Sequence, residues 1–93
     1  SLAFYEPLME WIEQYISSPR DTTVNVELKY FNSSSAKILL TLFKRLAVIS
    51  KKNFRLDINW TYKEDDEDIR DSGSDFAALS GLAFKLIEKK VPL

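Results

Sequence analysis

Apolar residues recur at steps of three and four positions in two segments of the chain, which is the period of one face of an α-helix. The first segment covers residues 3–16 and the second residues 38–49, with basic residues continuing to Lys52. Pro7 falls in the first turn of the first segment, where a missing N–H costs little. We therefore expect two helices, with the apolar faces Tyr5, Leu8, Ile12, Tyr15 and Ile16, and Ile38, Leu39, Leu42, Phe43, Leu46 and Ile49.

Apolar and polar residues alternate in two further segments, residues 24–30 and 54–62. This period of two is typical of a strand with one buried face. An acidic turn over residues 64–68 leads into a third, less regular helix containing Ile69, Phe76, Ala77 and Leu79, and residues 83–88 form a short last strand. The expected order is helix-strand-helix-strand-helix-strand.

Strands separated by helices of this length favour parallel pairing through right-handed crossovers. A chain of 93 residues, 45% of them hydrophobic, has room for one core. Residues 1–93 are therefore expected to form a single small α/β layered domain with a mainly parallel sheet. Functional groups of open parallel sheets collect at the carboxyl ends of the strands, which places residues 32–35 and 63–68 at the same end of the molecule.

The composition removes several classes of function. The chain has no Cys and no His, so it lacks thiolate nucleophiles, the commonest general base and the commonest metal ligands. Its net charge of −1 gives no indication of the positively charged surface that nucleic-acid-binding proteins use. No apolar run approaches the ~20 residues of a membrane span, and no basic segment followed by an apolar one begins the chain. We expect a cytoplasmic protein without cofactor, metal, nucleic-acid or membrane binding.

A polar hydroxyl cluster, residues 32–37, stands where the first strand stops and the second helix begins. A plain helix cap explains Asn32, Ser33 and Ser34, because Ser is a preferred N-cap and Asn makes local turns. Lys37, placed in the first helical turn, opposes the helix dipole unless an anion binds there. A phosphoryl group on Ser33 would supply that anion and disturb a partner docked on the same face. Both interpretations of this cluster, a helix cap and an anion site, remain possible.

Two other chemistries fit this cluster less well. A nucleotide phosphate loop needs Gly, and none stands between Tyr30 and Leu42. A Ser nucleophile with a Lys base requires only Ser33 and Lys37, four residues apart, but no oxyanion-hole Gly accompanies them. We therefore do not expect an enzyme.

The acidic run, residues 64–68, allows three interpretations. A solvated helix start is the simplest, because acidic residues are favourable at a helix N-terminus. The run does not match a calcium-binding loop, since Gly73 is misplaced and Arg70 occupies a ligand position. Five adjacent carboxylates would also attract a basic partner, so Glu64, Asp65 and Asp66 are candidate partner-binding residues.

Three blocks of the chain resemble, in order and spacing, those of the SiaC-like family of bacterial regulatory phosphoproteins. The blocks are residues 4–11 (FYEPLMEW), 30–37 (YFNSSSAK) and 60–68 (WTYKEDDED). The resemblance implies a fold similar to the STAS domain of anti-sigma-factor antagonists and a role in partner-switching signalling. There a Ser/Thr kinase modifies the protein, a PP2C-type phosphatase reverses this, and the unmodified form binds and activates a diguanylate cyclase, linking it to cyclic di-GMP and biofilm control.

The family's phosphoacceptor directly follows the Asn of the central motif, and this position is Ser33. Asn32, Ser34, Ser35 and Lys37 match the rest of that motif and are expected to bind partners. Family members normally begin with two further strands before the first helix, and this chain is expected to lack them. The resulting hypothesis is a non-enzymatic phosphoswitch controlled at Ser33. The alternative is a constitutive interaction scaffold that uses the acidic run and the second helix without a covalent switch.

Overall fold

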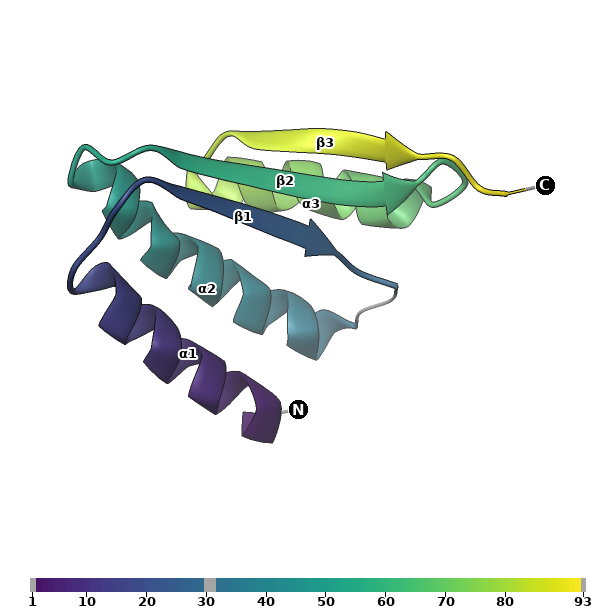
Figure 1. The fold of residues 1–93 in the computed structure, drawn as a ribbon. Coiled ribbons are helices and arrows are strands. Elements are labelled where there is room, and N and C mark those ends of the chain that lie inside the picture. Colours follow the sequence, from purple (N-terminus) through teal and green to yellow (C-terminus); the bar gives the residue numbers. More distant parts are fainter. Residues whose placement is uncertain (1, 30–31, 93) are drawn as a thin grey trace.

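The computed structural model describes residues 2–29 and 32–92, which form three helices and three strands in alternation (Figure 1). The helices are α1, Leu2–Ile16, α2, Ser33–Lys51, and α3, Glu67–Ser80. The strands are β1, Thr22–Glu27, β2, Leu56–Lys63, and β3, Phe84–Lys89. The expected α/β class and element order are therefore confirmed.

The three strands form a parallel sheet in the order β1-β2-β3. Val24 pairs with Ile58, and Ile58 pairs with Phe84, so these three apolar residues line up on one face. Each crossover moves the chain one strand in the same direction, and crossovers of one hand then place their helices on the same side. Figure 1 shows α1, α2 and α3 on one face of the sheet, with α2 in the middle.

The core lies between the sheet and this helix layer. Trp60 and Ile58 of β2 and Ile49 of α2 are almost completely inaccessible to solvent. The ring of Phe43 packs within 7 Å, centroid to centroid, of three others, those of Trp60, Phe76 and Phe84. Aromatic content thus serves packing here, and the buried cluster consists of Ile12, Ile16, Leu42, Phe43, Leu46, Ile49, Ile58, Trp60, Ile69 and Phe76.

Several predicted boundaries were wrong. The first strand was expected over residues 24–30, but β1 spans Thr22–Glu27, because its pairing with β2 begins at Thr22 and ends at Glu27. Leu28 continues the alternation without belonging to the strand, and Tyr30 lies outside the described residues. β2 begins two residues later than expected and β3 one residue later. Glu67 and Asp68, expected in a turn, are the first residues of α3.

The second face of the sheet is mainly polar, with Ile87 of β3 as an apolar exception. No described helix covers this face (Figure 1). Asn59 donates a side-chain hydrogen bond to Asn25 on β1, at 2.9 Å. Lys89 of β3 pairs with Glu27 of β1, with 3.1 Å between Nζ and Oε2. Polar side chains therefore satisfy one another across the strands on this face.

β1 has no neighbour on its outer edge among the described strands. Beside this edge, α1, β1 and α2 enclose a mainly apolar groove of about 410 Å³, whose wall includes Trp11. The two further strands expected from the family resemblance stay a prediction.

Candidate functional site

Asn32 caps the start of α2. Its backbone is extended, and its side-chain Oδ1 accepts the backbone N–H of Ser35 at 3.0 Å. The Asn32 carbonyl accepts the N–H of Ala36 at 2.9 Å, the first hydrogen bond of the helix. The local sequence explains this start, because Asn is among the best N-cap residues. The N-cap is thus Asn32, with Ser33 as the first helical residue.

Ser33 is exposed at the first position of α2. Within residues 2–29 and 32–92, no hydrogen bond occupies its hydroxyl group or the backbone N–H groups of Ser33 and Ser34. The first N–H groups of a helix lack partners inside the helix and carry part of its positive dipole. A group attached to the Ser33 hydroxyl would therefore meet free backbone donors.

The predicted dipole conflict at Lys37 is corrected by the observed helix start. α2 begins at Ser33, so Lys37 is its fifth residue and lies beyond the first turn. The effect of the helix dipole falls off within that turn, so a Lys at this position costs little stability. Lys37 instead stands four residues after Ser33, on the same helix face, and side chains of helical residues lean toward the N-terminus. Its exposed ammonium group is thereby placed to reach an anion on Ser33.

The acidic run has structural partners for two of its candidate residues. Asp66 caps α3, since its Oδ1 accepts the backbone N–H of Ile69 at 3.0 Å. Glu64 accepts the N–H of Val91 at 3.3 Å and pairs with Lys90 at 3.5 Å. Asp65 is exposed and has no hydrogen bond or ion pair with another described residue. Helix capping and a turn contact thus explain much of this run, and partner binding by Glu64, Asp65 and Asp66 stays a prediction.

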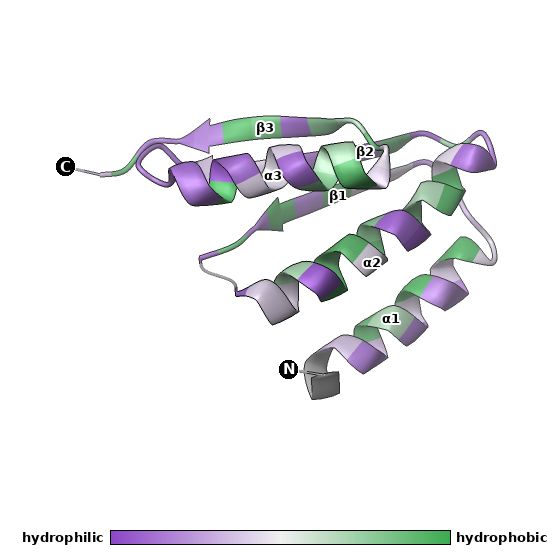
Figure 2. Ribbon diagram, turned by 180° about the vertical axis from the view of Figure 1, so that it is seen from behind, coloured by the Kyte–Doolittle hydropathy of each residue, from purple (hydrophilic) through white to green (hydrophobic). Residues whose placement is uncertain are grey.

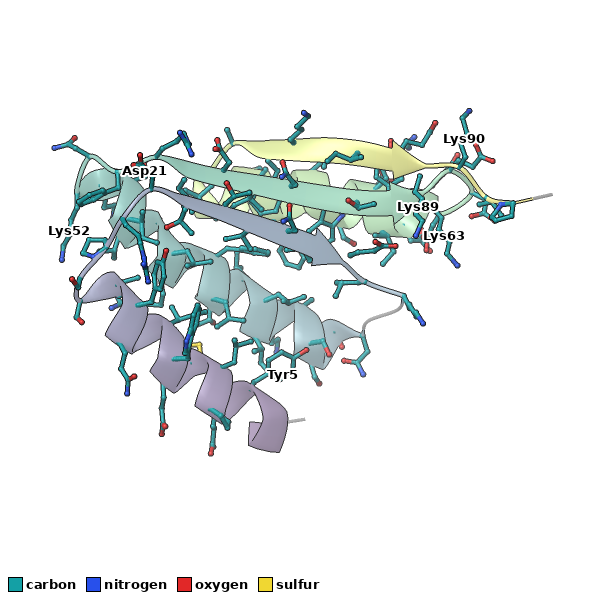
Figure 3. All side chains as sticks on the ribbon, in the orientation of Figure 1. Tyr5, Asp21, Lys52, Lys63, Lys89 and Lys90 are labelled. Atoms are coloured by element: carbon teal, nitrogen blue, oxygen red, sulfur yellow. The ribbon has the colours of Figure 1, made fainter. Side chains whose placement is uncertain are left out.

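The two candidate stretches lie at the same end of the sheet, because β1 and β2 are parallel and lead into them (Figure 1). No hydrogen bond or ion pair joins residues 32–37 to residues 64–66 in the described parts of the chain. Three lysines, Lys63, Lys89 and Lys90, extend from this end, as Figure 3 shows. Parallel pairing thus gathers polar groups at one end without merging them into a single site.

Sequence reasoning missed a hollow of about 250 Å³ between α2 and α3. Lys37 lines it from α2, and Asp75 and Leu79 line it from α3. Leu79 is 62% exposed, more than any other large hydrophobic side chain among those described. In the sequence, the periodic pattern that includes Leu79 predicts only that residue 79 belongs to a helix. Such a pattern does not show which other helix packs beside it.

The described residues show neither metal-binding geometry nor a membrane-spanning helix. No group of three or more Asp or Glu side chains among them is arranged to hold a metal ion. None of the helices described is both long and apolar enough to cross a bilayer.

Comparisons with known proteins point to one family. No curated protein and no solved structure matches the chain. The family described as SiaC family regulatory phosphoprotein matches residues 1–89, which include all six helices and strands. The match confirms the resemblance that the three sequence blocks carry. The chain therefore belongs to the SiaC family of regulatory phosphoproteins.

Proposed function

We propose that this chain is a non-enzymatic, cytoplasmic binding protein of a bacterial partner-switching system, controlled by phosphorylation of Ser33. A Ser/Thr kinase modifies Ser33 and a PP2C-type phosphatase restores the hydroxyl. The unmodified form binds and activates a diguanylate cyclase, which produces cyclic di-GMP and controls biofilm formation. Membership of a regulatory phosphoprotein family supports the general role, and the resemblance supports the partners.

The exposed Ser33 hydroxyl at the first position of α2 is the observation that carries the site assignment. A kinase needs a free hydroxyl that its active site can reach, and the fixed helix start presents this one. The product would bring about −1.5 to −2 charges next to helix N–H groups and Lys37. The phosphorylated protein would therefore stay folded while its surface charge changes sign locally.

Mapping of the phosphorylated residue tests this proposal. The wild-type chain and the variants Ser33→Ala, Ser34→Ala and Ser35→Ala are incubated with a partner-switching Ser/Thr kinase and ATP, and the phosphopeptides are identified by mass spectrometry. We expect one phosphate on the wild type, none on Ser33→Ala, and undiminished transfer to the two neighbouring variants. Phosphate on Ser33→Ala at the wild-type level would refute the assignment.

Binding measurements separate the switch from the scaffold alternative. Affinity for the purified cyclase is measured for Ser33→Ala and Ser33→Asp. A switch predicts binding by Ser33→Ala and at least tenfold weaker binding by Ser33→Asp. Equal affinity of the two variants would favour a constitutive scaffold.

A further inference from the structure

The start of α2 holds several residues in succession that are good helix caps. Asn and Ser are both preferred N-cap residues, so Asn32, Ser33 and Ser34 are each suited to that role. Figure 2 shows the first turn of α2 in a pale colour, before the hydrophobic residues further along the helix. The residue that acts as the cap decides where the helix begins and which serine stands at its first position.

In the structure this cap is Asn32. Its Oδ1 accepts the backbone N–H of Ser35 at 3.0 Å, and its carbonyl accepts the N–H of Ala36 at 2.9 Å. Ser33 is consequently the first helical residue, and its exposed hydroxyl group forms no hydrogen bond with another described residue. The cap at Asn32 therefore leaves free the hydroxyl group that the proposed switch uses.

Loss of this cap would pass the role to Ser33. An N-cap side chain accepts the N–H of the second or third helical residue, so the Ser33 Oγ would turn back toward the N–H of Ser35 or Ala36. The helix would then begin one residue later, at Ser34. The exposed first position with a free hydroxyl group would belong to Ser34 instead of Ser33.

Phosphoryl transfer depends on where the hydroxyl group points. The serine Oγ bonds to the γ-phosphorus of ATP, the bond from that phosphorus to the β,γ-bridging oxygen breaks, ADP leaves, and the hydroxyl proton passes to a base on the kinase. The attacking oxygen must lie in line with the leaving oxygen. A side chain that turns back over the helix end does not present its oxygen in this way, so the cap selects the serine.

We propose that Asn32 is a positioning residue that directs phosphorylation to Ser33 rather than to Ser34. It acts through the start of α2 and not through contact with the reacting atoms. A side chain at position 32 that accepts the Ser35 N–H should therefore keep the choice of serine, and an aliphatic one should lose it. This inference rests on the proposed function, because it needs a kinase that modifies this turn.

The test compares the wild type, Asn32→Ala and Asn32→Asp after incubation with a partner-switching Ser/Thr kinase and ATP. Tandem mass spectrometry gives the ratio of phosphate on Ser34 to phosphate on Ser33. We expect this ratio to rise about fivefold or more in Asn32→Ala, because the lost cap no longer disfavours the later helix start. In Asn32→Asp the carboxylate still accepts the Ser35 N–H, so the ratio should stay within about twofold of the wild type.

Ile49→Val is the matched control. It removes a buried methyl group from the same helix and destabilises the domain, while residues 32–35 stay unchanged. Its phosphate ratio should equal that of the wild type. Amide hydrogen exchange of Ser35 reports the cap bond, and it should be faster in Asn32→Ala than in Ile49→Val.

The outcomes separate this inference from the proposed function. Phosphate on Ser33 of the wild type, with a shift toward Ser34 in Asn32→Ala alone, supports both. The wild-type ratio in Asn32→Ala, even with less total phosphate, overturns the positioning role and leaves the switch standing. An equal shift in Asn32→Asp or in Ile49→Val also overturns the positioning role. Absence of phosphate from Ser33 of the wild type overturns both.

Discussion

Gly73 is buried in α3 directly against the indole ring of Trp60. A Cβ atom built on Gly73 would lie 2.5 Å from Cδ1 and 2.6 Å from Nε1 of that ring. Trp60 cannot easily move away, because it is completely buried and its Nε1–H donates to the Ile69 carbonyl at 2.8 Å. The absence of a side chain at residue 73 therefore lets α3 lie close to β2.

Gly73→Ala is expected to destabilise the fold despite the higher helix propensity of Ala. Overpacking of this kind costs about 1–3 kcal/mol, against a propensity gain of about 1 kcal/mol. Chemical denaturation monitored by far-UV circular dichroism gives the free energy of unfolding. Ser74→Ala, at the exposed neighbouring position, is the control and should equal or exceed the wild type. A Gly73→Ala chain as stable as Ser74→Ala would show that the contact is not tight.

Asn32 fixes the first turn that presents Ser33. Asn32→Ala removes the acceptor of the Ser35 N–H, which stands 3.0 Å away, and is expected to cost about 0.5–2 kcal/mol of unfolding free energy. Asn32→Asp keeps an acceptor at this position and should retain most of the stability. Thermal and denaturant unfolding of the two variants measure the difference. Equal loss in both would assign the effect to the amide group rather than to the cap.

At the scale of the elements, an ion pair between Arg45 and Glu13 joins α2 to α1. Arg45 donates to both carboxylate oxygens of Glu13, at 2.7 Å each. This hydrogen bonding holds the pKa of Glu13 below its ordinary value of 4.5, and the same pair raises the pKa of Arg45. Since both side chains are substantially exposed, the pair is open to screening by salt.

The stability of the wild type relative to Glu13→Gln should depend on pH. A lowered pKa in the folded state means that the carboxylate contributes stability above its unfolded pKa, near 4.5, and loses this contribution as pH falls through the folded value. The melting temperature of the wild type should exceed that of Glu13→Gln at pH 7, and the two should converge in the acidic range below about pH 4.5 and in 1 M salt. A difference that keeps its size as pH falls through the acidic range would assign the effect to packing.

At the scale of the whole molecule, the switch should change binding without changing the fold. Ser33→Asp places a negative charge at the N-terminus of α2, where the dipole favours it by about 0.3–1 kcal/mol. Its free energy of unfolding should equal or slightly exceed that of the wild type, while its affinity for the cyclase falls. Unfolding of Ser33→Asp under native conditions would show instead that modification acts by disrupting the domain.

The sequence by itself determined the six elements and their order, and its resemblance to the SiaC family put the phosphoacceptor candidate at Ser33. Periods of 3.6 and 2 residues are local properties that each segment expresses on its own. The cap at Asn32 is local too, because its side chain reaches only three residues along the chain. Ser33 could for this reason be placed at a helix start before any tertiary contact was known.

Three features were decided only by the tertiary structure. They are the ends of β1, the close contact of Gly73 with Trp60, and the position of Lys37 and Asp75 on opposite sides of the hollow between α2 and α3. The alternation that predicted a strand over residues 24–30 describes side-chain polarity, whereas the pairing of Thr22 with Leu56 depends on sheet register. Lys37 and Asp75 stand 38 positions apart in the sequence. They line the same hollow because both crossovers place their helices on the same face of the sheet. Such contacts depend on how distant segments pack, which no local pattern contains.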